Sequence, residues 1–129
     1  MTKTAKAARK KPTSVTDQLT AAIVSGMQEK KAKGISILDL RGLNGAAVDV
    51  FVICQGDSST QVEAVSRSVV ETVEKIIQEK PAHTEGMKNA KWVLIDYISV
   101  VAHIFQPDQR AYYGIERLWA DAEITEIPD

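Results

Sequence analysis

The chain has 129 residues, of which 44% are hydrophobic and 26% are charged. This length suits a single domain, and the composition is that of a globular soluble protein, which excludes a disordered or fibrous chain. The one cysteine, Cys54, excludes an intramolecular disulfide and a cysteine-based zinc site. It favours a reducing compartment, so the cytoplasm is the expected location, with Cys54 as a small buried apolar residue.

Charge is distributed unevenly along the chain. Residues 1–12 carry five basic side chains and no acidic one, whereas the remainder holds 11 basic and 17 acidic residues. A basic segment on an acidic body is compatible with contact to nucleic acid. The absence of aromatic residues in the segment favours the other interpretation, a solvated and disordered tail over residues 1–13.

The first expected element is a helix. It begins near Ser14, because Ser14 and Asp17 form an N-terminal capping pattern and apolar residues follow at helical spacing. Gly34 is expected to end this region. A strand over 35–40 follows, and then an uninterrupted apolar strand over 50–54, which is typical of a central strand buried on both faces.

The segment "QGDSST" should start the longest helix, over residues 59–79. Ser58 and Gln61 fit a capping box, and Pro81 ends the helix. One stripe of apolar residues at helical spacing should be buried. It consists of Val62, Val65, Val69, Val73 and Ile76.

Loops are expected between these elements. In the loop over 41–49, an ion pair among Asp39, Arg41 and Asp49 is expected to steady the chain. The segment 82–91 also reads as a loop, in which His83 is solvated.

The stretch "WVLIDYISVVAHIF" over 92–105 is the most apolar part of the chain, but it is too short to span a membrane. It is predicted to be a β-hairpin that turns within "DYIS" and pairs Asp96 with Ser99. Alternation along the strands then gives one aliphatic side, formed by Val93, Ile95, Val100, Ala102 and Ile104. The other, mixed side holds Trp92, Leu94, Asp96, Ser99, Val101, His103 and Phe105.

Two interpretations of the mixed side remain open. Tryptophan and other aromatic residues beside a few polar groups are typical of the middle of a protein–protein interface. Alternatively, a helix covers this side, and Trp92 and Phe105 are ordinary core residues. The composition is not catalytic, because it lacks a second acid, a nucleophile with an adjacent base, and a metal cluster.

The C-terminal part "QPDQRAYYGIERLWADA" is predicted to form one or two short helices, started by Pro107 or Asp108 and interrupted at Gly114. Residues 123–129 are expected to be a frayed acidic tail. Together, these elements predict an α/β fold with a single mixed sheet of at least four strands packed with helices.

Four segments in this order resemble the ribosomal silencing factor family (RsfS or Iojap) across residues 14–122. They are "GISILDLRG", "VDVFVICQGDSSTQV", "EGMKNAKWVLIDYISVVAHIF" and "RAYYGIERLW". One departure is Ile98-Ser99, which stands where the family often has Gly-Asp.

The resemblance implies a nucleotidyltransferase-like shape, a homodimer when free, and no catalysis or cofactor. It implies that the protein binds the large ribosomal subunit at ribosomal protein L-fourteen, blocks joining of the small subunit and lowers translation under nutrient limitation. Contact of the basic tail with ribosomal RNA is a further expectation. The predicted partner-binding residues are Trp92, Leu94, Asp96, Tyr97, Val101, His103 and Phe105.

The implied shape also suggests an alternative, a nucleotidyl- or phosphoryl-transfer enzyme with a divalent-metal site. The segment "QGDSST" could offer backbone N–H groups to an anion. However, Asp96 is alone on its strand and Asp39 precedes its loop, so the paired acids that hold Mg²⁺ in such enzymes are missing. A capped helix start is the commoner meaning of the segment.

Overall fold

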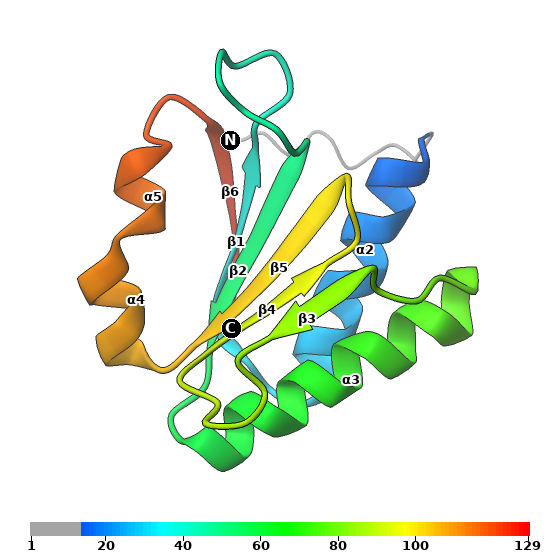
Figure 1. Ribbon diagram of the computed structural model, residues 1–129, viewed down its shortest axis with the longest axis vertical. Coiled ribbons are helices and arrows are strands. Elements are labelled where there is room, and N and C mark those ends of the chain that lie inside the picture. Colours follow the sequence, from blue (N-terminus) through cyan, green and yellow to red (C-terminus); the bar gives the residue numbers. More distant parts are fainter. Residues whose placement is uncertain (1–13) are drawn as a thin grey trace.

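The computed structural model describes residues 14–129 and contains one six-stranded sheet in the order β3-β4-β5-β2-β1-β6 (Figure 1). β2 and β5 run parallel, and the other neighbouring strands are antiparallel. The predicted α/β fold with a mixed sheet is therefore confirmed. The strands are β1 (Lys33–Asp39), β2 (Val50–Gln55), β3 (His83–Glu85), β4 (Trp92–Asp96), β5 (Val100–Phe105) and β6 (Glu123–Ile127).

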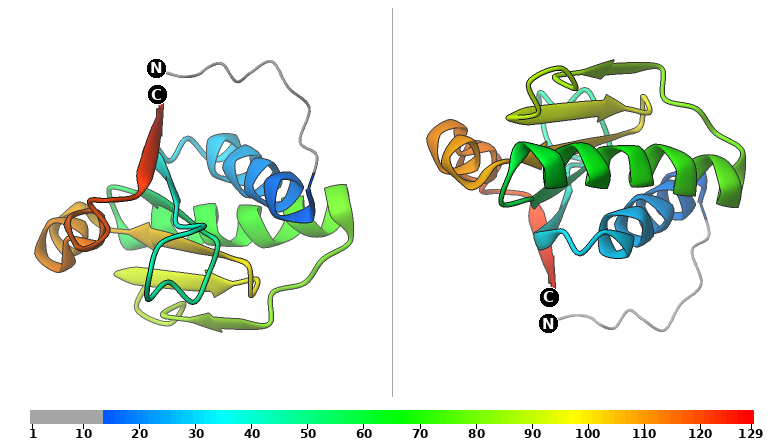
Figure 2. Two further views of the ribbon diagram at one scale, coloured as in Figure 1. Left: turned by 90° about the horizontal axis from the view of Figure 1, so that it is seen from above. Right: turned by 90° about the horizontal axis from the view of Figure 1, so that it is seen from below.

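Two long helices, α2 (Val15–Glu29) and α3 (Ser59–Ile77), cover one face of the sheet (Figure 2). Both predicted N-terminal caps form, because Ser14 accepts the Asp17 N–H at 3.0 Å and Ser58 accepts the Gln61 N–H at 3.1 Å. The aliphatic side of the hairpin packs here, together with the buried Cys54. Ile76 is an exception to the predicted apolar stripe, since it is 52% exposed at the end of α3.

The opposite face is only partly covered. Two short helices, α4 (Pro107–Tyr113) and α5 (Ile115–Leu118), form as predicted around Gly114 and lie on this side of the sheet (Figure 2). A second core lies between α5, the loop after β1, and strands β1, β2 and β5. Its buried members are Leu38, Leu40, Ile53, Phe105 and Ile115.

The end of α2 differs from the prediction. The residue with left-handed backbone after the helix is Lys31, at φ 61°, and Gly34 already belongs to β1. Gly34 also has a positive φ, of 62°, and it lies where the pairing of β1 with β2 shifts register. Its role is therefore to accommodate a β-bulge, which a glycine does without steric cost.

Both edge strands correct the sequence prediction. β3 forms inside the segment expected to be a loop and pairs with β4, although His83 is exposed as predicted. β6 replaces the expected frayed tail, because residues 123–127 pair with β1 from Ile35 to Asp39. Edge strands are partnered on one side only, so their sequences stay polar and lack the apolar signature of inner strands.

The hairpin forms within 92–105, but its register differs by two residues from the predicted one. Asp96 pairs with Val101 and Trp92 pairs with Phe105, which leaves Ile98 and Ser99 as the two turn residues. Because a shift of two preserves the alternation of side chains, the two predicted sides of the hairpin are still sorted correctly.

The turn holds Ile98 at φ 77°, which is unusual for a β-branched side chain. Two-residue turns with a positive φ at their first position favour glycine there, so Ile98 is strained. Ile98 is 67% exposed, and its N–H donates to the Asp96 carboxylate at 2.7 Å. This local bond helps to hold the strained conformation.

Replacement of Ile98 by glycine is therefore expected to raise the free energy of unfolding by about 1 kcal/mol, as relief of strain exceeds the entropy cost of glycine. Urea unfolding followed by circular dichroism measures this change. Ser99→Gly is the matched control. Ser99 does not have a positive φ, so this variant should be less stable than the wild type. If Ile98→Gly lost as much stability as the control, Ile98 would not be strained in the wild type.

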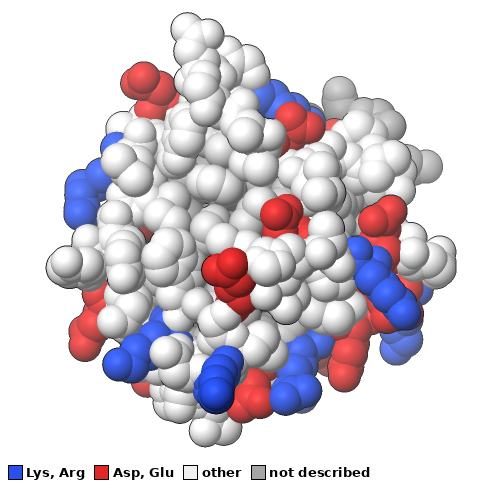
Figure 3. Space-filling view, in the orientation of Figure 1, with Lys and Arg blue, Asp and Glu red and all other residues white. Residues whose placement is uncertain are grey.

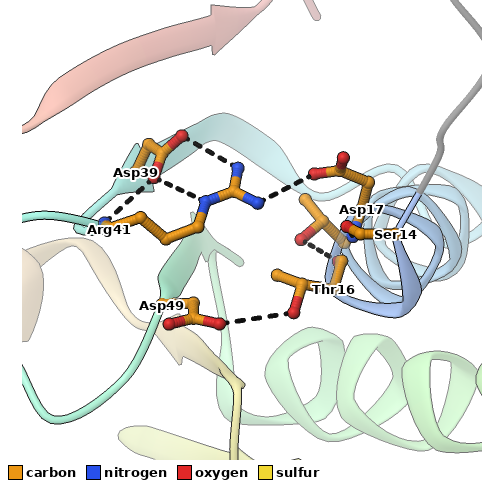
Figure 4. A network of polar contacts seen from close by, with 7 residues as sticks. Ser14, Thr16, Asp17, Asp39, Arg41 and Asp49 are labelled. Atoms are coloured by element: carbon orange, nitrogen blue, oxygen red, sulfur yellow. Dashed lines mark hydrogen bonds and ion pairs between the residues drawn. The ribbon is translucent and has the colours of Figure 1, made fainter.

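The loop after β1 is fixed to the start of α2 (Figure 4). Arg41 contacts the Asp39 carboxylate at 2.9 Å and the Asp17 carboxylate at 3.3 Å. Thr16 donates to Asp49 at 3.4 Å. The predicted ion pair of Asp39 with Arg41 is thus confirmed, and Arg41 also joins it to Asp17 of α2. Asp49 is instead held by Thr16.

Within residues 14–129, no helix has the length and apolar character needed to cross a membrane.

Candidate docking face

The uncovered part of the second sheet face lies over β3 and β4, since every residue of β5 is buried. Trp92, Leu94 and Asp96 of β4 are half-buried there, and His83 and Glu85 of β3 pair with Asp96 and Leu94. Mostly uncharged side chains fill the surface between α4–α5 and the strands, with acidic side chains near its middle and charged side chains of both signs at its margin (Figure 3). The accessible side chains here combine large apolar residues with a few polar ones, as expected of a protein-binding surface.

An aromatic cluster forms the boundary between this open area and α4. The ring of Trp92 lies 4.6 Å from that of Tyr113 and 5.0 Å from that of Phe105, measured between centroids. Phe51 of β2 extends the cluster through His103, at 4.7 Å. The partly accessible residues Phe51, Trp92, Leu94, Asp96 and Tyr113 are called the docking face below.

Two members of the docking face were not among the residues predicted from the sequence. Phe51 lies in an apolar strand whose neighbours are all buried, so its side could not be distinguished by alternation alone. Tyr113 comes from α4, whose position over Trp92 depends on contacts distant in sequence. The pair Tyr112-Tyr113 directly before the helix-ending Gly114 was the available signal, because tyrosine is enriched at protein interfaces.

Four of the predicted partner-binding residues are in fact buried. Tyr97 and Val101 are each 5% exposed, His103 is 4% exposed, and Phe105 is 1% exposed and packs in the second core. The core interpretation of the mixed side therefore holds for its β5 residues, and the interface interpretation stays a prediction for the β4 residues. Trp92, Leu94 and Asp96 remain accessible, and the β5 residues behind them are core.

Tyr97 lies on the other face of the sheet. It is 5% exposed and packs in the core beneath α2 and α3, so the structure corrects its placement on the partner-facing side. Burial, together with the nearby carboxylates of Glu79 and Glu74, raises the pKa of Tyr97 to about 12. Its hydroxyl therefore stays protonated and neutral under physiological conditions.

His103 connects the buried and accessible parts of the aromatic cluster. Its Nδ1 accepts a hydrogen bond from the Trp92 indole N–H at 3.0 Å. Burial lowers the pKa of His103 to about 4, so the imidazole is neutral at pH 7. Its Nε2 is buried and has no hydrogen-bond partner within residues 14–129.

The polar groups relevant to the enzyme alternative are engaged elsewhere. At the start of α3, the Asp57 N–H donates to the Gln61 side chain at 2.8 Å, and Ser58 caps the helix. Burial of Asp39 is outweighed by hydrogen bonds from Arg41, which lower the pKa of Asp39. No group of three or more potential metal-ligating side chains occurs in the described part of the chain.

Known proteins are similar to this chain in sequence and in fold. Residues 12–129 match a family model described as "Ribosomal silencing factor during starvation". A protein named ribosomal silencing factor RsfS from Halalkalibacterium halodurans is 38% identical over 113 residues, which cover 85% of this chain and 92% of that protein. A crystal structure of a Chromobacterium violaceum protein matches with a TM-score of 0.77 and 29% identity, covering 83% of this chain and 88% of the other.

A more distant relative carries a name that refers to one ribosomal subunit. The mouse protein named "Mitochondrial assembly of ribosomal large subunit protein 1" is 27% identical over 99 residues, which cover 75% of this chain and 43% of that protein.

Proposed function

Since this chain belongs to the ribosomal silencing factor family, which represses translation through the ribosome, we propose that it acts by docking on the large ribosomal subunit. The docked protein would contact ribosomal protein L-fourteen and occupy space that the small subunit needs for joining. Translation would fall as a result under nutrient limitation.

The observation that carries this proposal is the half-exposed aromatic cluster at the docking face. Tryptophan and tyrosine are the residues that most often dominate binding energy at interfaces, especially near the centre of the contact. Trp92 and Tyr113 lie against each other there, between the half-buried Leu94 of β4 and the exposed end of α4. A standard interface of roughly 800 Å² per partner would have room for all five residues of the docking face.

We also propose that the action is steric and non-catalytic. Asp96, the only acid of the docking face, accepts the Ile98 N–H at 2.7 Å, and its neighbours in that face are aromatic or aliphatic. The imidazole of His83, which stands opposite Asp96 on β3, is bonded to Glu85 at 2.7 Å, so we assign Asp96 to polar contact and register at the interface. Steric exclusion requires only that the docked protein is rigid and occupies the surface on which the small subunit joins.

The decisive experiment is sedimentation of the purified protein with separated ribosomal subunits. The wild type should sediment with large subunits and not with small subunits. Trp92→Ala should weaken this binding by about 2 kcal/mol, or roughly 30-fold, because it removes the anchor of the docking face. Ile76→Ala is the matched control, since Ile76 is an exposed apolar residue of α3 beneath the opposite sheet face.

Circular dichroism must show that Trp92→Ala stays folded at the assay temperature, because Trp92 also packs on Phe105. Equal binding of wild type and a folded Trp92→Ala would argue against the docking face. A subunit-joining assay with the same variants then tests whether docking and exclusion are lost together.

Residues 1–12 lie outside the described part of the chain, but their five basic side chains support a contact with ribosomal RNA. Sedimentation at increasing salt tests this. If the segment neutralises phosphates, the affinity of the full chain should fall more steeply with salt than the affinity of a variant without residues 1–12.

We further propose that the free protein is cytoplasmic and a homodimer. Light scattering of the purified protein checks the homodimer.

A further inference from the structure

The hydrogen bond between Trp92 and His103 determines how the docking face presents its largest side chain. The indole N–H donates to Nδ1 of His103 at 3.0 Å, so the nitrogen edge of the indole ring points toward β5. β3 pairs with residues 94–96 of β4, and the chain just after β3 passes the Trp92 backbone at Gly86, where an added Cβ atom would meet the Trp92 carbonyl. The carbon edge of the ring is consequently the part turned away from β5.

His103 is itself held firmly. It lies in the middle of β5, an inner strand paired with β2 and β4, and it is 4% exposed. Its ring packs edge-on against Phe51, at 4.7 Å between centroids, and nearly parallel to Phe105, at 6.1 Å. Because the imidazole cannot swing into solvent, its Nδ1 is a fixed acceptor for the indole.

The protonation state follows from the same bond. Nδ1 accepts a hydrogen bond from the Trp92 indole N–H, so the neutral imidazole must carry its own proton on Nε2. That Nε2 has no partner among the described residues, which makes His103 a costly residue for a merely structural position. An apolar residue of similar size would avoid this cost but would leave the indole N–H without an acceptor.

We propose that His103 is a positioning residue, which holds the Trp92 indole in one orientation before a partner binds. This inference rests on the proposed docking function and specifies the partner's side of the contact. The surface that receives Trp92 is an apolar slot without a hydrogen-bond acceptor for the indole, since the N–H is already satisfied within the chain. Preorganisation of this kind reduces the entropy lost on binding.

The test uses full-length protein with His103→Asn and His103→Leu. The Oδ1 of asparagine occupies a position similar to Nδ1 and can accept the indole N–H, whereas leucine cannot. Two-dimensional NMR of the ¹⁵N-labelled protein observes the indole N–H of Trp92 directly, and Trp119 provides an internal reference in every sample. Binding to large subunits is measured by sedimentation with the same proteins.

We expect one ordered, downfield-shifted Trp92 indole signal in the wild type and in His103→Asn. In His103→Leu the signal should lose this shift and report greater motion, and affinity should fall about 5- to 10-fold while the thermal unfolding midpoint stays equal or rises. A purely structural role predicts the reverse, namely that affinity follows stability. If His103→Leu does not fold, Trp92→Phe removes the same bond from the donor side and should weaken binding by a similar factor.

The proposal would be overturned if His103→Leu kept an ordered indole and unchanged affinity. It would also be overturned if His103→Asn did not show the downfield-shifted Trp92 indole signal of the wild type. The NMR result remains decisive even if the wild type does not bind large subunits. In that case the docking function fails, while the orientation of Trp92 by His103 is still confirmed or rejected in the free protein.

Discussion

Gly26→Leu is expected to lower the free energy of unfolding by about 3 kcal/mol or more, the largest loss from any single substitution considered. Gly26 lies where α2 crosses α3. A Cβ atom at this position would lie 2.8 Å from the Cα of Val69 and 3.1 Å from the carbonyl oxygen of Ser68. Both are backbone atoms of a helix, so they cannot turn aside as a flexible side chain would, and the two helices must separate.

Separation of the helices would also break a buried hydrogen bond, because the Ser68 hydroxyl donates to the Gly26 carbonyl at 2.7 Å. Leucine has a high helix propensity, so any loss of stability must come from packing and not from the helix itself. Urea unfolding monitored by circular dichroism measures the effect. Ser25→Leu is the matched control, since Ser25 is the exposed neighbour on the same helix, and equal midpoints for the two variants would refute the close approach.

Acidification from pH 6.5 to pH 4 is expected to cost the wild type about 3 kcal/mol more stability than it costs His103→Leu. Burial lowers the pKa of His103 from the usual 6.5 to about 4 in the folded chain. Between these values the unfolded chain binds a proton at His103 that the folded chain does not. The free energy of unfolding therefore falls as pH decreases through this window, and the contribution is fully present above pH 6.5.

Urea unfolding of both proteins at several pH values isolates this contribution, because His103→Leu retains the other titrating groups. Parallel pH profiles for the two proteins would show that His103 is solvated or already charged when folded. Protonation of Nδ1 would also remove the acceptor of the Trp92 indole, so the downfield indole signal of the wild type should be lost over the lower part of the same range.

The buried and accessible halves of the aromatic cluster have different roles. Phe105 belongs to the second core, and together with the buried His103 it forms a support on β5 for the ring of Trp92. Tyr113 of α4 packs against the same ring. Variants that test direct contact with a partner are therefore chosen at the accessible positions, because truncation of the buried Phe105 would also reduce stability.

The sequence by itself determined the local features of this protein. Both helix starts followed from side chains that cap within three residues, at Ser14 and Ser58. The two sides of the hairpin followed from the alternation of side chains along a strand. This assignment is correct although the predicted register was wrong by two residues. The order of four segments along the chain was sufficient to indicate the family, which the family model and the relatives then showed.

Only the tertiary structure decided which side chains a partner can reach. Alternation assigns residues to a face, but whether a face is covered depends on contacts between distant segments, such as Tyr113 with Trp92. For the same reason the strand character of 123–127 became evident only through pairing with β1, since a polar edge strand has no periodic burial to reveal it. The burial of His103 likewise depends on Phe51, which is 52 residues away in sequence and adjacent in space.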